Sequence, residues 1–191
     1  MTRVCFSGGR DSTLAALRLA HSGQRLILVT VTSDHLVGID SVRRRLLELR
    51  GHLPLNTRWI QVAEPEDLKT DTRFYAPSCL PCHHAYTVAA VWVAEKCGAR
   101  EVAFGYVGYQ SSWPEQTPQA VQRLARILSR HGLTLLLPVY DLQTKADAIE
   151  ELRELKVLPP TRSNRSACGR QPIPNWHRRC LTKSWVAGKQ R

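Results

Sequence analysis

The apolar residues of this chain fall into short runs that alternate with segments of helical periodicity. Runs rich in Val, Ile and Leu that are short enough to be buried strands cover residues 4–6, 25–34, 57–63, 101–106 and 133–140. Between them, segments with an apolar face predict helices at residues 12–20, 41–49, 85–98, 118–131 and 144–155. Thr144 is expected to cap the last helix. From Pro159 onward these regular signals fade, because Pro, Arg, Ser and Asn dominate.

The alternation of strands and helices predicts an α/β fold, namely a doubly wound, mostly parallel sheet with helices on both faces. We expect one domain over residues 1–158. A short irregular extension over residues 159–191, basic and containing cysteines, is expected to pack on the same domain. In such folds ligands bind beyond the carboxyl ends of the strands. The first strand-to-helix turn is therefore a favoured place for a ligand.

That turn reads Ser-Gly-Gly-Arg-Asp-Ser, from Ser7 to Ser12. Two adjacent glycines let backbone N–H groups face a bulky anion, and the following helix adds its positive N-terminal end. Ser7 and Ser12 add hydroxyl groups, and Arg10 adds a cation. The spacing is neither G-x-x-x-x-G-K-[ST] nor G-x-G-x-x-G. The sequence therefore predicts a phosphate or pyrophosphate site, and the alternative is a glycine turn that only tightens strand-to-helix packing.

The string S-G-G-R-D-S after an apolar strand resembles the PP-loop of the N-type ATP pyrophosphatases, S-G-G-x-D-S. The resemblance implies an adenine nucleotide alpha-hydrolase-like fold of the HUP type. It also implies cleavage of ATP between its α- and β-phosphates and transfer of AMP to a carbonyl oxygen, from which a nucleophile then displaces it. The nucleotide-binding residues implied by this loop and by the end of the second strand are Ser7, Gly8, Gly9, Arg10, Asp11, Ser12 and Thr30. Asp11 would also be catalytic by positioning Mg²⁺, and Thr30 would meet the adenosine.

Three later segments resemble the cyano-deazaguanine synthases of that superfamily. Residues 104–128 resemble their stretch from a glycine strand end to S-G-Y-P-D and a helix, which makes Gly105 a nucleotide-binding candidate. Residues 138–152 resemble their lysine-containing segment, with Lys145 as the matching catalytic candidate. Residues 163–180 resemble a degraded form of their four-cysteine zinc loop. The chain departs from the pattern there, since only Cys168 and Cys180 are present.

An additional cysteine pair, Cys79 and Cys82, lies in "SCLPCHH" and resembles the P-C-x-x-C elements of PP-loop sulfur-transfer enzymes. In one interpretation, these two close a tetrahedral Zn²⁺ site with Cys168 and Cys180, since C-x-x-C is the usual half-site spacing. Histidines that could substitute as ligands are His83, His84 and His177. In the other, Cys79 and Cys82 are catalytic thiols carrying sulfur, or they hold an iron–sulfur cluster. Cys5 and Cys97 are expected to be small core residues.

Composition and charge narrow the setting and the partners. The net charge of +11 and the pI near 9.9 favour anionic partners such as nucleotides and RNA. No apolar run approaches the roughly 18 residues that span a bilayer, and no basic region followed by a long apolar stretch suggests a signal peptide. We therefore expect a cytoplasmic protein without membrane contact, in which the six cysteines are not structural disulfides.

Together, the resemblances imply an enzyme that adenylates the carbonyl of a guanine-like base or its nucleotide and then replaces the oxygen with sulfur, releasing AMP and pyrophosphate. Ammonia as nucleophile, giving a nitrile or amide, is one alternative; thiolation of tRNA is another, and a nucleotide-binding regulatory module is the non-enzymatic one. A homodimer is a further expectation.

Trp92 is expected in the core, whereas Trp113, Tyr106 and Tyr109 could stack on a base or be ordinary loop aromatics. Glu115 and Asp141 could bind substrate amino groups or Mg²⁺, or be solvated surface charges.

Overall fold

The computed structural model describes residues 2–32, 38–63 and 80–158. Within these ranges, five strands form one parallel sheet in the order β3-β2-β1-β4-β5, as the alternating pattern predicted. The strands are β1 (Thr2–Cys5), β2 (Leu26–Thr32), β3 (Arg58–Ala63), β4 (Glu101–Ala103) and β5 (Thr134–Leu136). The predicted extension over residues 159–191 lies outside the described part of the chain.

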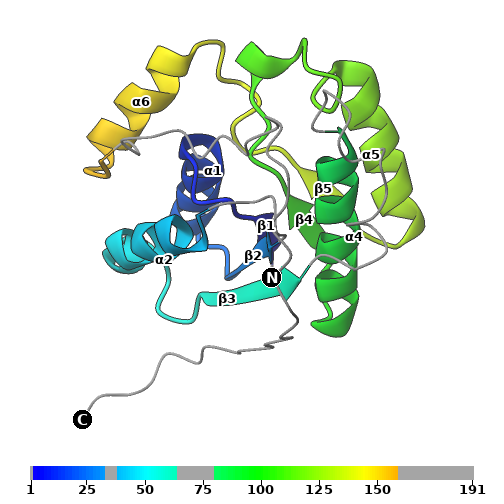
Figure 1. Ribbon diagram of the computed structural model, residues 1–191, viewed down its shortest axis with the longest axis horizontal. Coiled ribbons are helices and arrows are strands. Elements are labelled where there is room, and N and C mark those ends of the chain that lie inside the picture. Colours follow the sequence, from blue (N-terminus) through cyan, green and yellow to red (C-terminus); the bar gives the residue numbers. More distant parts are fainter. Residues whose placement is uncertain (1, 33–37, 64–79, 159–191) are drawn as a thin grey trace, which may run out of the picture.

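Helices cover both faces of this sheet, which gives three layers (Figure 1). The first helices, α1 (Arg10–His21) and α2 (Ile39–Glu48), lie on one side, and a short 3₁₀ turn, η1 (Leu49–Gly51), follows α2. On the other side lie α4 (Leu80–Lys96) and α5 (Pro118–Arg130). A second 3₁₀ turn, η3 (Gly108–Gln110), follows β4, and α6 (Lys145–Glu154) packs on α1. The predicted doubly wound architecture is confirmed.

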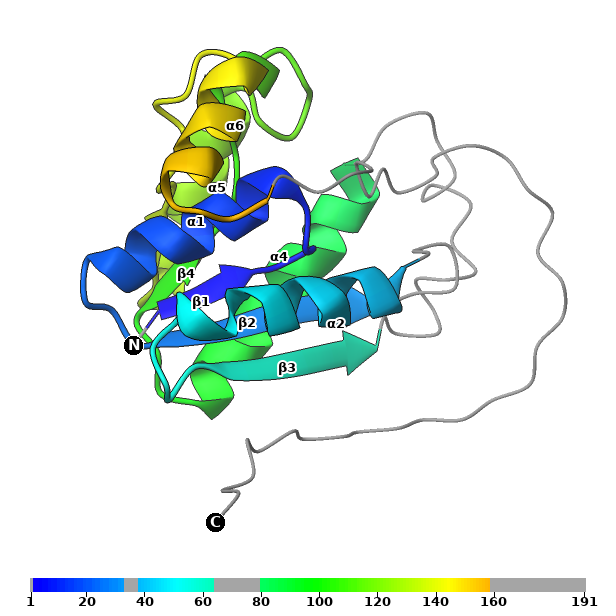
Figure 2. The same ribbon diagram turned by 90° about the vertical axis from the view of Figure 1, so that its left-hand side faces the viewer.

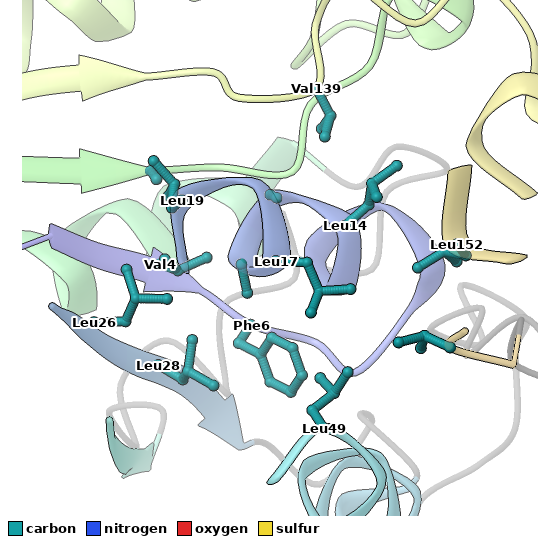
Figure 3. Packing of buried hydrophobic residues seen from close by; sticks show 14 of the residues in the cluster. Val4, Phe6, Leu14, Leu17, Leu19, Leu26, Leu28, Leu49, Val139 and Leu152 are labelled. Carbon is teal, nitrogen blue, oxygen red and sulfur yellow. The ribbon is translucent and has the colours of Figure 1, made fainter. Parts of the chain in front are cut away.

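Alternation along the strands divides the core between the two faces. In β2, Leu26 and Leu28 contribute to the cluster around α1, whereas Ile27 and Val29 face α4. Figure 3 shows the α1 cluster, whose labelled members are Val4, Phe6, Leu14, Leu17, Leu19, Leu26, Leu28, Leu49, Val139 and Leu152. Strands buried on both faces carry apolar residues at consecutive positions. This explains why the sequence shows continuous apolar runs rather than alternation.

Local signals placed two helix starts correctly. Thr144 caps α6 through a capping box, in which its hydroxyl accepts from the amide of Asp147 while the Asp147 carboxylate accepts from the amide of Thr144. Pro118 begins α5 at a position where its missing N–H has no intrahelical partner to lose. The strand predicted at residues 133–140 is shorter than expected, because the chain turns at Pro138 instead of extending the ladder.

The prediction for Trp92 is wrong, since 52% of its surface is exposed. Helix α4 is apolar around most of its circumference, so periodicity could not identify its buried face. Ala90, Val93 and Ala94 pack inward, and Val88 and Trp92 point outward. Among the described residues, no helix is both long enough and apolar enough to cross a bilayer.

Candidate active site

The sheet order creates a switch point between β1 and β4. From β1 the chain proceeds through β2 to the edge strand β3, and it returns to the other side of β1 as β4. The loops after β1 and β4 therefore leave the carboxyl-end edge of the sheet next to each other and lead to helices on opposite faces. In α/β sheets, ligands bind at such a switch point. The motif from Ser7 to Ser12 is the loop that follows β1.

The loops after β1 and β4 are in direct contact at Gly105. A Cβ built on Gly105 would lie 2.7 Å from the backbone N of Ser12 and 2.9 Å from the backbone C of Asp11. Along β4 and its exit, Val102 and Phe104 face the cluster beneath α5, while Ala103 faces the α1 cluster. Position 105 therefore points at the first turn of α1, and only glycine fits there.

The turn itself depends on Gly8 and Gly9. Gly8 has a φ of +71°, and a Cβ there would lie 3.0 Å from the Cα of Val42 in α2. Gly9 is the N-cap of α1 and offers no side-chain oxygen to the first-turn amides. The N–H groups of a first helical turn have no intrahelical acceptor, so they remain available to an anion.

Two serine hydroxyls brace this turn. The Oγ atoms of Ser7 and Ser12 are 3.0 Å apart, and the Ser12 Oγ accepts from the Ser7 amide at 3.3 Å and donates to the Gly9 carbonyl at 3.2 Å. The Ser7 Oγ accepts from the Gly9 amide at 3.3 Å. Both hydroxyls therefore hold the shape of the loop.

Asp11 belongs to a three-residue cluster with Arg10 and Tyr109. The Arg10 Nε donates to the Asp11 carboxylate at 2.8 Å, and the Arg10 Nη2 donates to the Tyr109 hydroxyl at 2.6 Å. The Tyr109 hydroxyl donates to the same carboxylate at 2.5 Å. Burial and the Asp11 charge together raise the pKa of Tyr109 well above its usual value, so its hydroxyl stays protonated as a donor. The cation predicted at Arg10 is folded back onto Asp11.

Replacing Tyr109 with phenylalanine is expected to lower the free energy of unfolding by about 1–2 kcal/mol, because the half-exposed hydroxyl loses its hydrogen bonds to Asp11 and Arg10. Urea unfolding measures this change. A double-mutant cycle with Arg10→Met isolates the coupling between the two side chains around Asp11. Strict additivity in that cycle would show that the cluster does not act as a unit.

The Thr30 side chain is buried, whereas Lys145 is exposed. The Thr30 hydroxyl, at the end of β2, donates to the Phe6 carbonyl at 2.6 Å and accepts from the Trp59 indole at 2.9 Å. That hydroxyl is therefore already used inside the protein. Lys145 is exposed in the first turn of α6. The loop before α6 contacts the β4 exit, because the Leu142 carbonyl accepts from the Tyr109 amide at 3.2 Å.

Three of the four cysteines predicted to bind metal or carry sulfur lie outside the described residues, namely Cys79, Cys168 and Cys180. Cys82 lies in the first turn of α4. In the part of the chain that the structure describes, no group of three His, Cys, Asp or Glu residues could hold a metal ion. Cys5 is half-buried against the cluster beneath α5, and burial raises the pKa of its thiol to about 12, which disfavours the reactive thiolate.

A second polar cluster, formed by His83, Tyr106 and Glu115, lies at the β4 exit. The His83 Nδ1 is 3.0 Å from the Tyr106 hydroxyl, and the His83 Nε2 is 3.6 Å from a carboxylate oxygen of Glu115. Burial, with a smaller contribution from His84, lowers the pKa of His83 to about 4, so its ring is neutral near pH 7. Sequence reasoning named Glu115 but could not place it; the carboxylate is buried, whereas Asp141 is exposed and paired with Arg18.

No protein-family model matches the chain, and neither does any curated protein sequence. Several solved structures have the same fold. A predicted subunit of a tRNA methyltransferase from Methanocaldococcus jannaschii superposes with a TM-score of 0.55 at 16% identity, over 83% of this chain and 89% of that one. A 4-thiouridine synthetase in complex with RNA and bound ATP gives 0.63 at 20% identity, over 81% of this chain and 40% of that one.

The U34-tRNA thiolase NcsA from Methanococcus maripaludis, with its [4Fe-4S] cluster, gives a TM-score of 0.57 at 16% identity, over 84% of this chain and 58% of that one. The chain thus spans about half the length of the 4-thiouridine synthetase and of the thiolase. At these identities the likeness establishes a shared fold.

Proposed function

We propose that this protein is an AMP-forming ATP pyrophosphatase of the PP-loop type, which adenylates a carbonyl oxygen. The observation that carries the proposal is the S-G-G-R-D-S turn at the switch point of the sheet, where first-turn amides of α1 have no side-chain cap. Two structures with the same fold are named as a 4-thiouridine synthetase with bound ATP and as a tRNA thiolase, which supports adenylation followed by thiolation.

The residues of the turn fit the phosphates of ATP. A side chain at Gly8 would be strained by the positive φ, and one at Gly9 would meet the Ser7 hydroxyl at 3.3 Å, so glycines keep the cradle open. The amides from Arg10 to Ser12 and the positive end of α1 would hold the β- and γ-phosphates. Asp11 would help to hold Mg²⁺, which neutralises phosphate charge when bound.

The chain mainly contributes positioning and electrostatic stabilisation. An acceptor carbonyl oxygen attacks the α-phosphorus of ATP, and the bond to the bridging oxygen breaks, so that pyrophosphate leaves. Attack of a nucleophile on the adenylated carbon then expels AMP. The amides and hydroxyls of the turn are fixed in place before the charge of pyrophosphate develops, which is the condition for efficient electrostatic catalysis.

For the acceptor and nucleophile we propose a guanine-like base or nucleotide and a sulfur donor, with ammonia as the alternative. Cys79 and Cys82 would carry the sulfur or, with Cys168 and Cys180, hold Zn²⁺ or an iron–sulfur cluster. Metal analysis of the purified protein beside its Cys79→Ser variant decides between these roles. Loss of metal together with a lower melting temperature assigns a structural site, whereas loss of product in a stable, metal-free protein assigns a thiol.

The reaction is tested with ATP labelled at the α-phosphate, together with purine bases, nucleosides or tRNA and with sulfide or ammonium. We expect labelled AMP and unlabelled pyrophosphate, and we expect both to form only in the presence of one acceptor. Formation of ADP and phosphate would contradict the proposal. ATP binding without turnover under every condition would instead identify a nucleotide-binding regulatory module.

A base within tRNA is a second candidate acceptor, and the outer face of α5 favours it. Arg123, Arg126 and Arg130 are exposed on one face of this helix and, with Ile127, line an open hollow on the surface. Among the described residues, no ion pair neutralises these three arginines. Clustered arginines on a protein with a net charge of +11 suit the phosphates of RNA.

Changing all three α5 arginines to glutamine is expected to weaken tRNA binding at least about tenfold near physiological salt. The slope of log affinity against log salt should fall in magnitude by about 2 to 3. The charge-matched control changes Arg43, Arg44 and Arg50, which are exposed around α2 and η1. Equal losses in both triple variants would show that only net charge attracts RNA and that α5 is not the contact.

A further inference from the structure

Glu115 carries a buried carboxylate that is only partly satisfied. The residue is 4% exposed, and its Oε1 atom has no hydrogen-bond partner among the described residues. The His83 ring, which is neutral near pH 7, places its Nε2 at 3.6 Å from this atom, which is beyond hydrogen-bond range. An ionised carboxylate removed from water without full compensation is costly, so such a group in a native fold calls for an explanation.

Hydrogen bonds hold Gln116, the residue that follows Glu115 in the loop. The Gln116 side chain accepts from the Val107 amide at 3.0 Å and donates to the Gln110 side chain at 2.9 Å. The Tyr140 hydroxyl donates to the Gln116 carbonyl at 2.8 Å. Two parts of the chain, the segment after β4 and the loop before α6, therefore fix the position next to Glu115, which is the arrangement expected of a preorganised binding group.

This carboxylate lies at the same edge of the sheet as the proposed ATP site. A short connection joins the end of α4 to β4, so α4 runs antiparallel to the strands and its first turn lies at their carboxyl ends, as does the start of α1 (Figure 2). Contacts lead from one site to the other, since Gly105 packs on Ser12 and the next residue, Tyr106, contacts His83. The Glu115 cluster therefore lies at the carboxyl-end edge of the sheet, on the opposite face from α1.

We propose that Glu115 is the acceptor-recognition residue, whose carboxylate accepts a hydrogen bond from the N–H group beside the carbonyl of a cyclic amide in a nucleobase. This inference rests on the proposed function and specifies the acceptor of that reaction. The N1–H of guanine and the N3–H of uracil both have this chemistry, either in a free nucleoside or within RNA. A ligand donor would satisfy the oxygen that the protein leaves unpaired.

The hydrogen bond would also favour the first chemical step. A cyclic amide shares electrons among its nitrogen, carbon and oxygen atoms. A carboxylate that accepts from the N–H therefore increases electron density on the neighbouring carbonyl oxygen, which is the atom that attacks the α-phosphorus. Charge-assisted hydrogen bonds are roughly twice as strong as neutral ones, so a carboxylate suits this position better than an amide.

The test compares guanosine and uridine with 1-methylguanosine and N3-methyluridine, each titrated calorimetrically into the full chain without ATP. We expect at least one parent nucleoside to bind at least about tenfold more tightly than its methylated form. Glu115→Gln, which keeps a weaker neutral acceptor, should clearly reduce that discrimination, while Glu154→Gln, which removes an exposed carboxylate from α6, should preserve it. An unmodified tRNA transcript is the further probe. If the transcript binds the wild type but not Glu115→Gln, and no nucleoside binds the wild type, the base is recognised within RNA.

Thermal unfolding adds a second readout. Because the carboxylate is unpaired, Glu115→Gln should leave the melting temperature unchanged or raise it, whereas a structural ion pair with His83 would make it fall. Equal binding of methylated and parent nucleosides, or unchanged discrimination in Glu115→Gln, would overturn the proposal. So would a wild-type chain that binds a nonhydrolysable ATP analogue but neither the nucleosides nor the transcript. If the chain discriminates between parent and methylated nucleosides but does not bind the ATP analogue, only the proposed ATP chemistry is refuted.

Discussion

Changing Asp11 to asparagine is expected to reduce AMP formation at least about 100-fold and to leave the protein folded. Asparagine keeps an oxygen for the Tyr109 hydroxyl and Arg10, so the cluster retains its shape. It removes the negative charge that would hold Mg²⁺ beside the phosphates. Release of labelled AMP measures the first effect, and calorimetric titration with the magnesium complex of a nonhydrolysable ATP analogue measures the loss of affinity.

Asp40→Asn is the matched control, because Asp40 occupies the same position in the first turn of α2 and is also paired with an arginine, Arg43. It is expected to bind the analogue and to form AMP as the wild type does. If Asp11→Asn retained full activity, the carboxylate would have only a structural role beside Arg10 and Tyr109.

Changing Gly105 to alanine is expected to destabilise the fold by about 3 kcal/mol or more, at or beyond the upper end of the usual cost of overpacking. The added Cβ would lie 2.7 Å from a backbone nitrogen and 2.8 Å from the Cα of Ser12, and backbone atoms cannot move aside as a flexible side chain can. For a chain of this size, the melting temperature should fall by roughly 6–12 °C. The first turn of α1 must shift, so affinity for the ATP analogue should fall as well.

Gly51→Ala is the control, since a Cβ there has no neighbour within 4 Å. It should leave both the melting temperature and nucleotide affinity close to their wild-type values. A Gly105→Ala variant as stable as Gly51→Ala would contradict the close approach of the β1 and β4 exits that defines the site.

The features that the sequence predicted correctly are determined by residues that lie close together along the chain. Apolar runs predicted the five strands, and short-range capping predicted the start of α6 at Thr144. The position of the glycine loop followed from the order of elements, because the first strand-to-helix turn of a doubly wound sheet lies at the ligand-binding edge.

Contacts between distant segments could not be predicted in this way. Tyr109 binds Asp11 across 98 residues, and no pattern near either residue indicates the pairing. The buried face of α4 was ambiguous because apolar residues surround most of that helix, which led to the wrong prediction for Trp92. Glu115 is charged and lies in a loop, so its burial depends on packing against α4 and the β4 exit, which composition does not reveal.

The most direct measurement of the central claim is a crystal structure of the full chain with magnesium and the α,β-methylene analogue of ATP. The account predicts that the β- and γ-phosphates contact the backbone amides from Arg10 to Ser12 and the Ser7 and Ser12 hydroxyls. It also predicts that the α-phosphorus faces the crevice between the β1 and β4 exits. A triphosphate bound at another surface, with the turn between β1 and α1 making no phosphate contact, would contradict it.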